Sequence, residues 1–392
     1  MLKAIIFDMD GVLVDSELIH YQADKEMLKN HYDIDMDFEY YKQYIGGTVD
    51  NMWNGIIRDF GIQNTSAYEL NLLTDEIIEK MTEKTGYPAV AGVVRFVQML
   101  KRETSLRLAV ASSSSMSKIE HNIENLNISE CFDILVSGQS LQVSKPDPAI
   151  FLKTAEAMEI KPSECLVIED SENGVMAAVN AGIPCIGFIN PNSGNQNLSE
   201  ANAAFESFEN LDIDFIKMIY SHAVGEPAVI LETERLLIRE ISVEDVPRLY
   251  ELYDEEIVKY MPGLFEKIDE EMEYTKNYIK NIYGFYHYGM WLVVLKESNV
   301  IIGRAGVEYK EIPETKLTHE MGYMIGKKYQ GKGYAKEALS AIIEYMKRNF
   351  EINNFFVEVS KENEKSISLA RKMGFVFENK VNVRGYLVGE LL

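Results

Sequence analysis

The stretch KAIIFDMDGVLVDSE, from Lys3 to Glu17, places the strongest constraint on how this chain can fold. A short apolar run, Ala4 to Phe7, stops at two aspartates and a glycine. Because the run is β-branched and aromatic and too short for a helix, it predicts a parallel strand buried on both faces. Ligands of open α/β sheets gather at the carboxyl ends of strands, where Asp8 and Asp10 stand. Two carboxylates this close repel each other unless a cation or a shared proton relieves the charge.

Taken alone, the Asp-Met-Asp-Gly run is equally typical of an ordinary turn after a strand. Later strand ends supply further polar groups: Ser112 after LRLAVA, Lys145 in SKPDP, and Glu169 with Asp170 after CLVI. We expect these groups to share one edge of the sheet. A carboxylate nucleophile, a second carboxyl for proton transfer, oxygens for Mg²⁺ and donors for phosphoryl oxygens together predict phosphoryl transfer.

These motifs resemble the four motifs of the haloacid dehalogenase superfamily, specifically its β-phosphoglucomutase-like branch of phosphatases and mutases, across roughly the first half of the chain. The resemblance implies that Asp8 is the nucleophile that forms an aspartyl phosphate, and that Asp10 acts as general acid and then base. It implies the following binding roles: Ser112 and Lys145 for the phosphoryl group, and Asp8, the Asp10 carbonyl, Asp170 and Glu169 for Mg²⁺.

Residues of about 17–85 are predicted to form an inserted helical cap, because apolar residues recur at three- and four-residue spacing, as in AYELNLLTDEIIEKM. In the resembling branch this cap closes over the phosphate site and chooses the substrate, with hinges expected near Asp15 and near Gly86 to Pro88. His20 stands where the family often carries a substrate-site histidine. A helix-face histidine paired with a carboxylate is the alternative interpretation.

The cap loop YIGGTVD, Tyr44 to Asp50, departs from true β-phosphoglucomutases. Those enzymes carry a Lys and an Arg here to hold the second phosphate of their substrate, whereas this chain has Ile45 and Val49 at the matching places. Each lost charge-assisted contact is worth about 1.5 to 3 kcal/mol. The sequence therefore favours a phosphatase over a mutase.

From Val90 onward, strands and helices alternate, which predicts a doubly wound parallel α/β sheet in a first domain of residues 1–219. The run Ser112 to Ser115 opens one of these helices, and one of its serines is expected to serve as the helix N-cap. The predicted strands are Ala4 to Phe7, Leu106 to Ala111, Ile134 to Val136, Leu166 to Ile168 and Pro184 to Phe188.

Composition limits the partners and the location of the chain. Its 392 residues favour two or three domains, and 62 acidic against 39 basic residues give a net charge of -23. Such a charge is expected to repel nucleic acid and anionic membranes. No signal peptide or membrane-length apolar run is recognised. The chain has three widely spaced cysteines, Cys131, Cys165 and Cys185. Two of them lie at apolar strand positions and are interpreted as buried apolar residues, with a disulfide or metal role as the alternative. This interpretation suits a cytoplasmic location.

A linker is predicted at residues 220–228, YSHAVGEPA, followed by a second domain at 229–392. There, strands and helices no longer alternate strictly, which predicts an α+β domain with a partly antiparallel sheet. The expected elements are a strand in ILETERLLIREI, a helix from Val243, a helical region around Ile268 to Tyr283, and strands Met290 to Leu295 and Ile301 to Glu308.

A glycine-rich loop in this domain predicts an anion cradle, because glycines let backbone N–H groups turn inward and a helix start adds its positive dipole end. An ordinary turn with solvated lysines is the alternative. The loop comprises Gln330, Gly331, Lys332, Gly333, Tyr334 and Ala335. Together with TERLLIRE and the MGF at Met373 to Phe375, it resembles the GNAT acetyltransferases, in particular the branch of ribosomal-protein N-terminal acetyltransferases and their small-molecule relatives.

The GNAT resemblance implies direct transfer of an acetyl group from acetyl-CoA to an amine, on a small molecule or a protein N-terminus. Glu320 matches the glutamate that some relatives use to accept the amine proton, and a structural strand carboxylate is an equally weighted alternative. Asn363 and Ser366 match positions that contact CoA in relatives, or else form an N-cap pair for the last helix.

The sequence thus predicts a bifunctional enzyme: a Mg²⁺-dependent phosphatase of a small phosphorylated metabolite, followed by an acetyl-CoA-dependent N-acetyltransferase. The alternative is a sugar-phosphate mutase whose second domain binds CoA and regulates the first.

Overall fold

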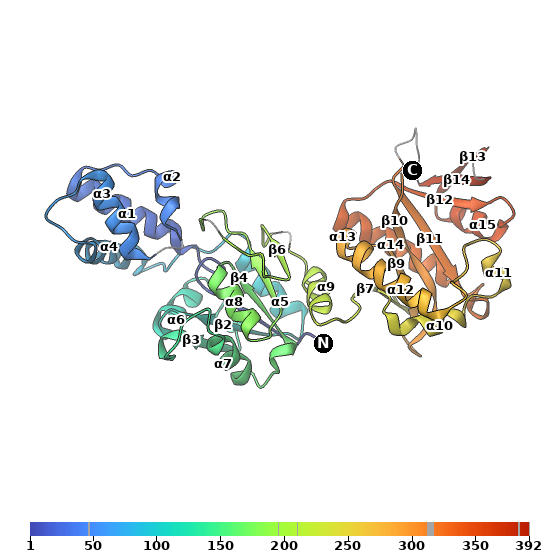
Figure 1. Cartoon of the computed structure of the whole chain (residues 1–392), viewed down its shortest axis with the longest axis horizontal. Coiled ribbons are helices and arrows are strands. Elements are labelled where there is room, and N and C mark those ends of the chain that lie inside the picture. Colours follow the sequence, from blue (N-terminus) through green and yellow to red (C-terminus); the bar gives the residue numbers. More distant parts are fainter. Residues whose placement is uncertain (46–47, 195, 210, 312–316, 383–384, 392) are drawn as a thin grey trace. The chain divides into compact units, whose positions relative to one another are not determined.

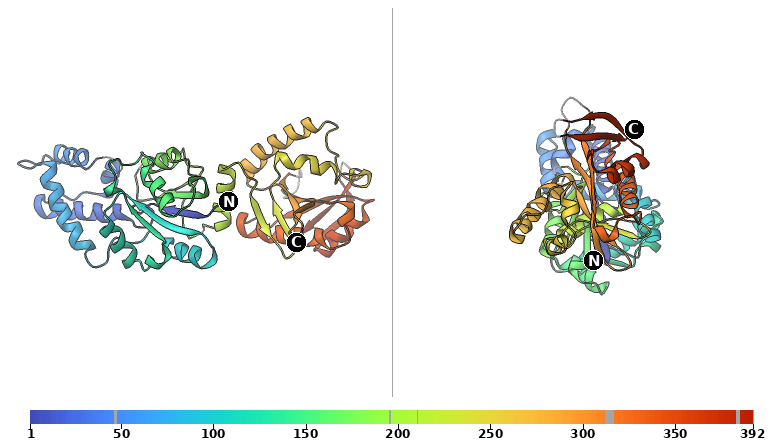
Figure 2. Two further views of the ribbon diagram at one scale, coloured as in Figure 1. Left: turned by 90° about the horizontal axis from the view of Figure 1, so that it is seen from below. Right: turned by 90° about the vertical axis from the view of Figure 1, so that its right-hand side faces the viewer.

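The structure is a computed structural model, and it describes residues 1–45, 48–194, 196–209, 211–311, 317–382 and 385–391. Gly46 and Gly47 of the cap loop therefore lie outside the described residues. The chain divides into two compact units, Met1–Val224 and Gly225–Leu392. Each unit contains its own β-sheet with surrounding helices (Figures 1 and 2).

The first unit is built on a six-stranded parallel sheet in the order β3-β2-β1-β4-β5-β6. This arrangement confirms the predicted α/β fold with a parallel sheet. The strands are β1 Ala4–Phe7, β2 Arg107–Ser112, β3 Ile134–Ser137, β4 Cys165–Glu169, β5 Cys185–Phe188 and β6 Ala203–Phe205. The helices that follow the cap are α5 Val93–Glu103, α6 Met116–Asn125, α7 Ala149–Ala157, α8 Glu172–Asn180 and α9 Ile213–Ala223.

Strand β1 lies at the centre of this sheet, and its side chains are completely buried on both faces. On one face, Phe7 packs edge-on against Phe96 of α5 and Phe132. On the other, Ile6 belongs to a cluster that includes Phe151 of α7. Burying a large apolar side chain contributes about 1.5 to 3 kcal/mol, so the strand that ends at Asp8 is held firmly in place.

Among the described residues, the inserted cap contains four α-helices with a hydrophobic core of their own. They are α1 Ser16–Tyr32, α2 Phe38–Tyr41, α3 Val49–Phe60 and α4 Ala67–Thr82. Trp53 is fully buried at the centre of this core, in a cluster with Met27, Ile56 and Leu70. The cap is therefore stabilised by its own packing.

Asp24 is a buried carboxyl within the cap, with 3% of its surface exposed, and burial raises its pKa to about 8. Because the unfolded chain releases this proton near the ordinary value of 3.8, the folded state binds more protons between these two values. The stability associated with protonated Asp24 is thus complete at low pH and lost as pH rises toward 8. We expect the melting temperature of the wild type to fall between pH 5 and 8.5 by several degrees more than that of Asp24→Asn. Equal pH dependence of the two melting curves would contradict this assignment.

The second unit carries an eight-stranded mixed sheet in the order β13-β14-β12-β11-β10-β9-β8-β7, which agrees with the predicted α+β fold. Its strands are β7 Val229–Glu232, β8 Leu236–Arg239, β9 Met290–Leu295, β10 Val300–Tyr309, β11 His319–Ile325, β12 Phe355–Ser360, β13 Phe375–Val381 and β14 Tyr386–Leu391. Its helices are α10 Val246–Tyr250, α11 Glu255–Val258, α12 Ile268–Tyr278, α13 Gly284–Tyr286, α14 Tyr334–Phe350 and α15 Glu364–Lys372.

Two predictions near the start of this unit were wrong in detail. ILETERLLIREI is not one strand but a hairpin of β7 and β8, because the chain turns at Thr233, whose N–H donates to the Leu236 carbonyl at 2.9 Å. The predicted linker also begins too early, since α9 continues to Ala223. Tyr220, at the start of that predicted linker, is buried, and its hydroxyl donates a hydrogen bond to the Ser163 carbonyl. An amphipathic helix end with polar neighbours resembles a linker in sequence.

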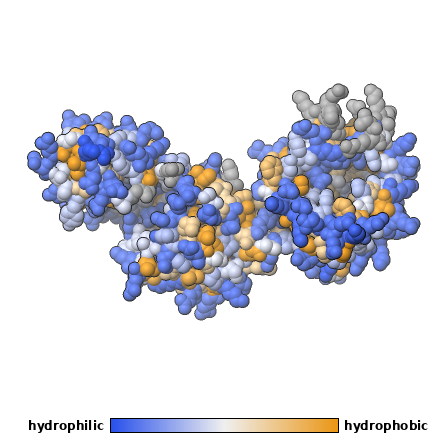
Figure 3. Space-filling view, viewed as in Figure 1, coloured by the Kyte–Doolittle hydropathy of each residue, from blue (hydrophilic) through white to orange (hydrophobic). Residues whose placement is uncertain are grey.

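The visible surface is largely hydrophilic, with hydrophobic residues in small patches (Figure 3). Within the ranges described, no helix combines the length and the apolar character needed to cross a membrane.

Candidate functional site

Asp8 and Asp10 follow β1 directly, in a tight loop at the carboxyl edge of the parallel sheet. The Asp8 N–H continues the sheet by donating to the Ile168 carbonyl at 3.0 Å. Gly11 then adopts a positive φ of 83°, and an added Cβ there would lie 2.1 Å from Oδ2 of Asp170. Only glycine permits both this turn and the close approach of Asp170 to the loop.

Lys145 lies between two buried carboxylates at this edge. Its Nζ donates to Oδ1 of Asp8 and, at 2.7 Å, to Oε1 of Glu169. The side chain is 10% exposed, and its Nζ also lies 5.0 Å from the ring centroid of Phe151. Burial acts to lower the pKa of Lys145, but Asp8 and Glu169 outweigh it and raise the pKa above its ordinary value. The lysine is therefore a fixed positive charge beside Asp8.

The carboxylates of Asp8 and Asp170 carry more negative charge than Lys145 neutralises. Burial, together with the nearby charges of Glu169 and Asp10, raises the pKa of Asp8 to about 7 against the opposing effect of Lys145. Burial, Glu169 and Asp8 likewise raise the pKa of Asp170. Such shifts mark a site that binds a cation or shares a proton.

This donor set suits a hard divalent cation. Carboxylate and carbonyl oxygens are the ligands that Mg²⁺ prefers, and it keeps several waters of its own. The part of the chain that the structure describes contains no cluster of three or more His, Cys, Asp or Glu side chains arranged around a metal position. Two carboxylates and one backbone carbonyl, as predicted for Asp8, Asp170 and Asp10, do not require such a cluster.

The hydrogen bonds of Glu169 favour a positioning role for this residue over the predicted role as a metal ligand. Its Oε1 accepts from Lys145, and its Oε2 accepts from the N–H of Ser171 at 2.8 Å and from the Ser171 hydroxyl at 3.0 Å. A Cβ on Gly174 would lie 1.7 Å from Oε1, so the first turn of α8 closes around this side chain. Because both oxygens are engaged, these contacts favour Glu169 as the residue that positions Lys145, in place of a direct metal ligand.

Two serines, one at the end of β2 and one in the loop that follows it, contact Asp10. Ser112, fully buried, donates to Oδ2 of Asp10 at 3.4 Å, and Ser114 donates to the same oxygen at 3.1 Å. Ser115 accepts from the N–H of Lys118 and is the N-cap of α6, which confirms that one serine of the run is a cap. Sequence analysis did not single out Ser114, and only its place in the serine run could have indicated it.

A loop after β5, residues 190–193, contacts the site and was missed by sequence analysis. Asn190 donates to the Gly11 carbonyl at 2.9 Å, Asn192 donates to Asp15 at 2.6 Å, and Ser193 donates to Asp170 at 2.8 Å. The run INPNS has the composition of a plain turn, so its position after a sheet strand was the one available signal.

His20 lies on α1, where its ring stacks on Tyr87 with centroids 5.9 Å apart. Burial and Lys118 lower its pKa, and Asp10 opposes them. The structure thus brings His20 into electrostatic range of Asp10. The alternative of an ion pair with a carboxylate is not observed, since His20 has no ion pair among the described residues.

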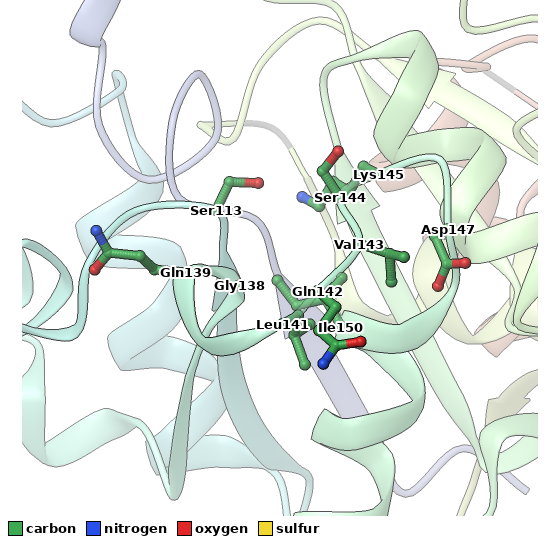
Figure 4. Close-up of a pocket in the computed structure, with 10 residues that line it drawn as sticks. All are labelled: Ser113, Gly138, Gln139, Leu141, Gln142, Val143, Ser144, Lys145, Asp147 and Ile150. Carbon is green, nitrogen blue, oxygen red and sulfur yellow. The ribbon is translucent and has the colours of Figure 1, made fainter.

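A small cavity of about 230 Å³ adjoins Lys145, between the loop after β2 and residues 138–147 (Figure 4). The hydroxyl of Ser113 and the amine of Lys145 both point toward this hollow in the close-up.

In the second unit, the predicted anion loop leads into α14. Gly331 and Gly333 both have positive φ, 77° and 86°, and Gly333 is the N-cap of the helix. Among the described residues, no side chain caps this helix start, so its first N–H groups point outward as they do in anion sites. The side-chain amide of Gln330 donates a hydrogen bond to the Ile325 carbonyl at 2.9 Å.

Arg235 fixes this loop from the β7–β8 hairpin. Its guanidinium forms an ion pair with Glu337 at 2.6 Å, donates to the Lys332 carbonyl at 3.2 Å and lies 4.5 Å from the ring centroid of Tyr334. Sequence analysis noted the TERLLIRE motif without a reason for it, and these contacts supply one.

Strands β11 and β12 run parallel but are paired at one register position, Glu320 opposite Phe356. Beyond that pair, toward the loop at Gln330, no further pairing between these two strands is found among the described residues. Glu320 therefore lies at the position where β11 and β12 are paired.

Glu320 is part of a charged group on one face of the sheet. Lys310 donates to Glu320 and to Glu358, while Glu308, opposite Glu320 on β10, accepts from Tyr278 at 2.6 Å. Burial raises the pKa of Glu320, and Lys310 opposes that effect. A carboxylate with a raised pKa is a better proton acceptor near neutral pH.

Asn363 and Ser366 form the N-cap pair that was the alternative prediction. The Asn363 side chain accepts from the N–H of Ser366 at 3.1 Å at the start of α15. The Ser366 hydroxyl forms a hydrogen bond of 2.9 Å with the hydroxyl of Tyr323, a residue of β11. Their predicted contact with CoA stays a prediction.

Two protein families match separate parts of the chain. Residues 5–188 match the haloacid dehalogenase-like hydrolase family, and residues 235–376 match the acetyltransferase (GNAT) domain family.

Three curated relatives illustrate the first match. A haloacid dehalogenase-like hydrolase domain-containing protein of Arabidopsis thaliana is 31% identical over 242 residues, 54% of this chain and 76% of that protein. The β-phosphoglucomutase of Bacillus subtilis is 31% identical over 195 residues, 47% of this chain and 83% of its own length. The phosphorylated carbohydrates phosphatase of Thermotoga maritima is 26% identical over 206 residues, 52% of this chain and 92% of the relative.

Proposed function

Because the chain belongs to the haloacid dehalogenase-like hydrolases and carries a GNAT acetyltransferase domain in its C-terminal part, we propose how its two activities, phosphatase and N-acetyltransferase, are carried out. The first unit hydrolyses a small phosphate monoester through an aspartyl phosphate on Asp8. The second transfers an acetyl group from acetyl-CoA to an amine. The contact that carries the proposal is Lys145 held between Asp8 and Glu169.

In the first half-reaction, an oxygen of Asp8 attacks phosphorus and the bond to the leaving oxygen breaks, while Asp10 donates a proton to that oxygen. In the second, Asp10 takes a proton from water as the water oxygen attacks phosphorus, and the bond between the Asp8 oxygen and phosphorus breaks, which releases inorganic phosphate and the Asp8 carboxylate. Lys145, Ser112 and Ser114 stabilise the phosphoryl oxygens. Mg²⁺ held by Asp8, Asp170 and the Asp10 carbonyl would neutralise charge on the same group.

A phosphatase is favoured over a mutase by the surroundings of the cap loop. Ile45 lies in apolar contact range of the core loop, since a Cβ on Gly194 would come within 2.9 Å of its Cβ, and Val49 is 50% exposed. Neither position offers a cation for a second phosphate. Phosphate release from a panel of monoesters, with Mg²⁺ and after its removal by EDTA, tests this activity. Turnover that requires an added sugar bisphosphate would support the mutase.

In the acetyl transfer step, the amine nitrogen attacks the thioester carbonyl and the CoA sulfur leaves as a thiol. We propose that Glu320 accepts the proton of the ammonium form and that the loop at Gly331 and Gly333 holds the pyrophosphate of CoA.

Glu320→Gln is expected to lower the rate of acetyl transfer about one hundred-fold, because glutamine cannot accept the proton. The KM for acetyl-CoA should stay within a few-fold, since the loop that binds it is untouched. Acetylation of an amine panel, followed by release of free thiol, provides the measurement, and Glu297→Gln on the exposed β9–β10 turn is the matched control. Unchanged turnover in Glu320→Gln would show that Glu320 does not accept the proton and has a structural role beside Lys310.

A further inference from the structure

The loop that follows β5 holds one oxygen of the Asp170 carboxylate. The Ser193 hydroxyl donates to Oδ2 of Asp170 at 2.8 Å, and Asp170 is buried, with 7% of its surface exposed. This oxygen also lies against Gly11, since a Cβ on that glycine would come within 2.1 Å of it. Within the described ranges, Oδ1 of Asp170 accepts no hydrogen bond. The protein therefore engages one oxygen of this carboxylate and leaves the other for a ligand.

The same loop also fixes the backbone of Asp170. The side-chain amide of Gln196 donates to the Asp170 carbonyl at 2.5 Å and to the Phe188 carbonyl at 3.2 Å. Asp170 follows β4 directly, and Phe188 is the last residue of β5, the neighbouring strand of the sheet. Asp170 is thus held both at its carbonyl and at its carboxylate.

Asn190, at the start of this loop, fixes the position of Ser193. Asn190 is 3% exposed, and its side chain donates to the Gly11 carbonyl at 2.9 Å. Its Oδ1 accepts from the N–H of Asn192 at 2.8 Å, and its carbonyl accepts from the N–H of Ser193 at 3.1 Å. An asparagine that binds the backbone two residues further on stabilises a tight turn. This turn is attached to the loop after β1, so the hydroxyl that reaches Asp170 is placed by a buried anchor.

The carboxylate of Asp8 is divided in the same way. Its Oδ1 accepts from Lys145, and its Oδ2 accepts no hydrogen bond in the part of the chain that the structure describes. Asp8 and Asp170 can then each offer one oxygen, and the third predicted ligand is the single carbonyl oxygen of Asp10. Mg²⁺ requires near-octahedral geometry and keeps several waters, whereas Ca²⁺ takes about six to eight oxygens and often both oxygens of one carboxylate. A set of single oxygens therefore suits Mg²⁺ better than Ca²⁺.

We propose that Ser193 sets the preference of the phosphatase site for Mg²⁺ over Ca²⁺, because it occupies Oδ2 of Asp170 and leaves only Oδ1 for the metal ion. Ser193 is a positioning residue, since it acts on the metal ion through Asp170. This inference rests on the proposed phosphatase function and adds the residue that determines its metal specificity. Without the hydroxyl, Oδ2 becomes free to bind Ca²⁺ together with Oδ1, and the orientation that suits Mg²⁺ is no longer fixed.

The test measures metal binding directly. The full chain, freed of metal with EDTA and dialysed, is titrated with Mg²⁺ and separately with Ca²⁺ by calorimetry, and the ratio of the two Kd values is compared between variants. Ser193→Ala should lower the preference for Mg²⁺ at least about ten-fold, the value of one hydrogen bond to a charged group. Ser193→Thr keeps a hydroxyl and should keep the wild-type ratio. The matched control is Ser105→Ala, an exposed serine that precedes β2 and should also keep this ratio.

Three outcomes overturn the proposal. The first is an unchanged ratio of Kd values in Ser193→Ala. The second is an equal loss of preference in Ser193→Thr, which would assign the effect to packing and not to the hydroxyl. The third is an Asp170→Asn variant that binds Mg²⁺ as tightly as the wild type, because Ser193 could then not act through Asp170.

Metal binding does not require turnover, so the calorimetry separates this proposal from the proposed function. A ten-fold loss of preference in Ser193→Ala, with the wild-type ratio in Ser193→Thr, supports the role of Ser193 even if the wild type releases phosphate from no ester. Phosphate release by the wild type, together with an unchanged ratio in Ser193→Ala, overturns the role of Ser193 and leaves the proposed function in place.

Discussion

Asp8→Asn is expected to reduce phosphate release by about four orders of magnitude or more, because the amide cannot attack phosphorus and the slow uncatalysed reaction is all that remains. The substitution is nearly isosteric, and the asparagine oxygen can still accept from Lys145. Since burial raises the pKa of Asp8, removing this charge should leave the melting temperature unchanged or slightly higher. Loss of activity without loss of stability identifies a chemical role.

Two controls accompany Asp8→Asn. Glu156→Gln, on the exposed side of α7, should leave phosphate release unchanged. Acetyl transfer by Asp8→Asn itself should also be unchanged, because the residues proposed for that reaction all lie in the second unit. If Asp8→Asn released phosphate at a rate within ten-fold of the wild type, Asp8 would not be the nucleophile.

Lys145→Met is expected to have the second largest effect, because it removes the one charge that both Asp8 and Glu169 contact. Leaving one side of a buried pair without its partner costs about 3 to 5 kcal/mol. Phosphate release should fall about a thousand-fold, since the phosphoryl oxygens lose a cation and Asp8 becomes harder to ionise.

The loss of stability expected for Lys145→Met depends on pH, and the direction of this dependence can be derived. Without Lys145, the pKa of Asp8 rises above about 7, so the carboxyl is protonated when the variant folds near neutral pH. The variant should therefore be less destabilised at pH 6 than at pH 8.5, where folding requires a buried carboxylate without a partner. Thermal melting at both pH values gives the measurement, with Lys153→Met on the exposed side of α7 as control. Equal destabilisation at both values would show that the lysine acts through packing alone.

The convergence of Asp8, Ser112, Lys145 and Asp170 could be predicted from sequence, because carboxyl ends of parallel strands must meet at one edge. Ser114 and the loop at Asn190 could not. Their side chains reach the site through loop conformations, and a loop of Asn, Ser and Pro has the same composition whether or not it contacts a site. The role of Glu169 could not be predicted either, since the sequence does not show which neighbouring groups donate hydrogen bonds to its two carboxylate oxygens.

In the second unit, the loop at Gly331 and Gly333 could be predicted because glycines before a helix have a recognisable local geometry. The surroundings of Glu320 could not, because Lys310, directly after β10, and Glu358, in β12, reach it from separate parts of the chain. The β7–β8 hairpin was missed because its turn at Thr233 contains neither glycine nor proline.

The most direct test of the phosphatase account is to locate the covalent intermediate. Wild-type protein is mixed with Mg²⁺ and a phosphate ester that it hydrolyses, and the reaction is quenched in acid during turnover. The protein is then digested, and its peptides are sequenced by mass spectrometry. The account predicts one phosphoryl group on Asp8, which disappears once the ester is exhausted and is absent from Asp8→Asn. Continued turnover with no phosphorylated peptide, or with the phosphoryl group on another residue, would contradict it.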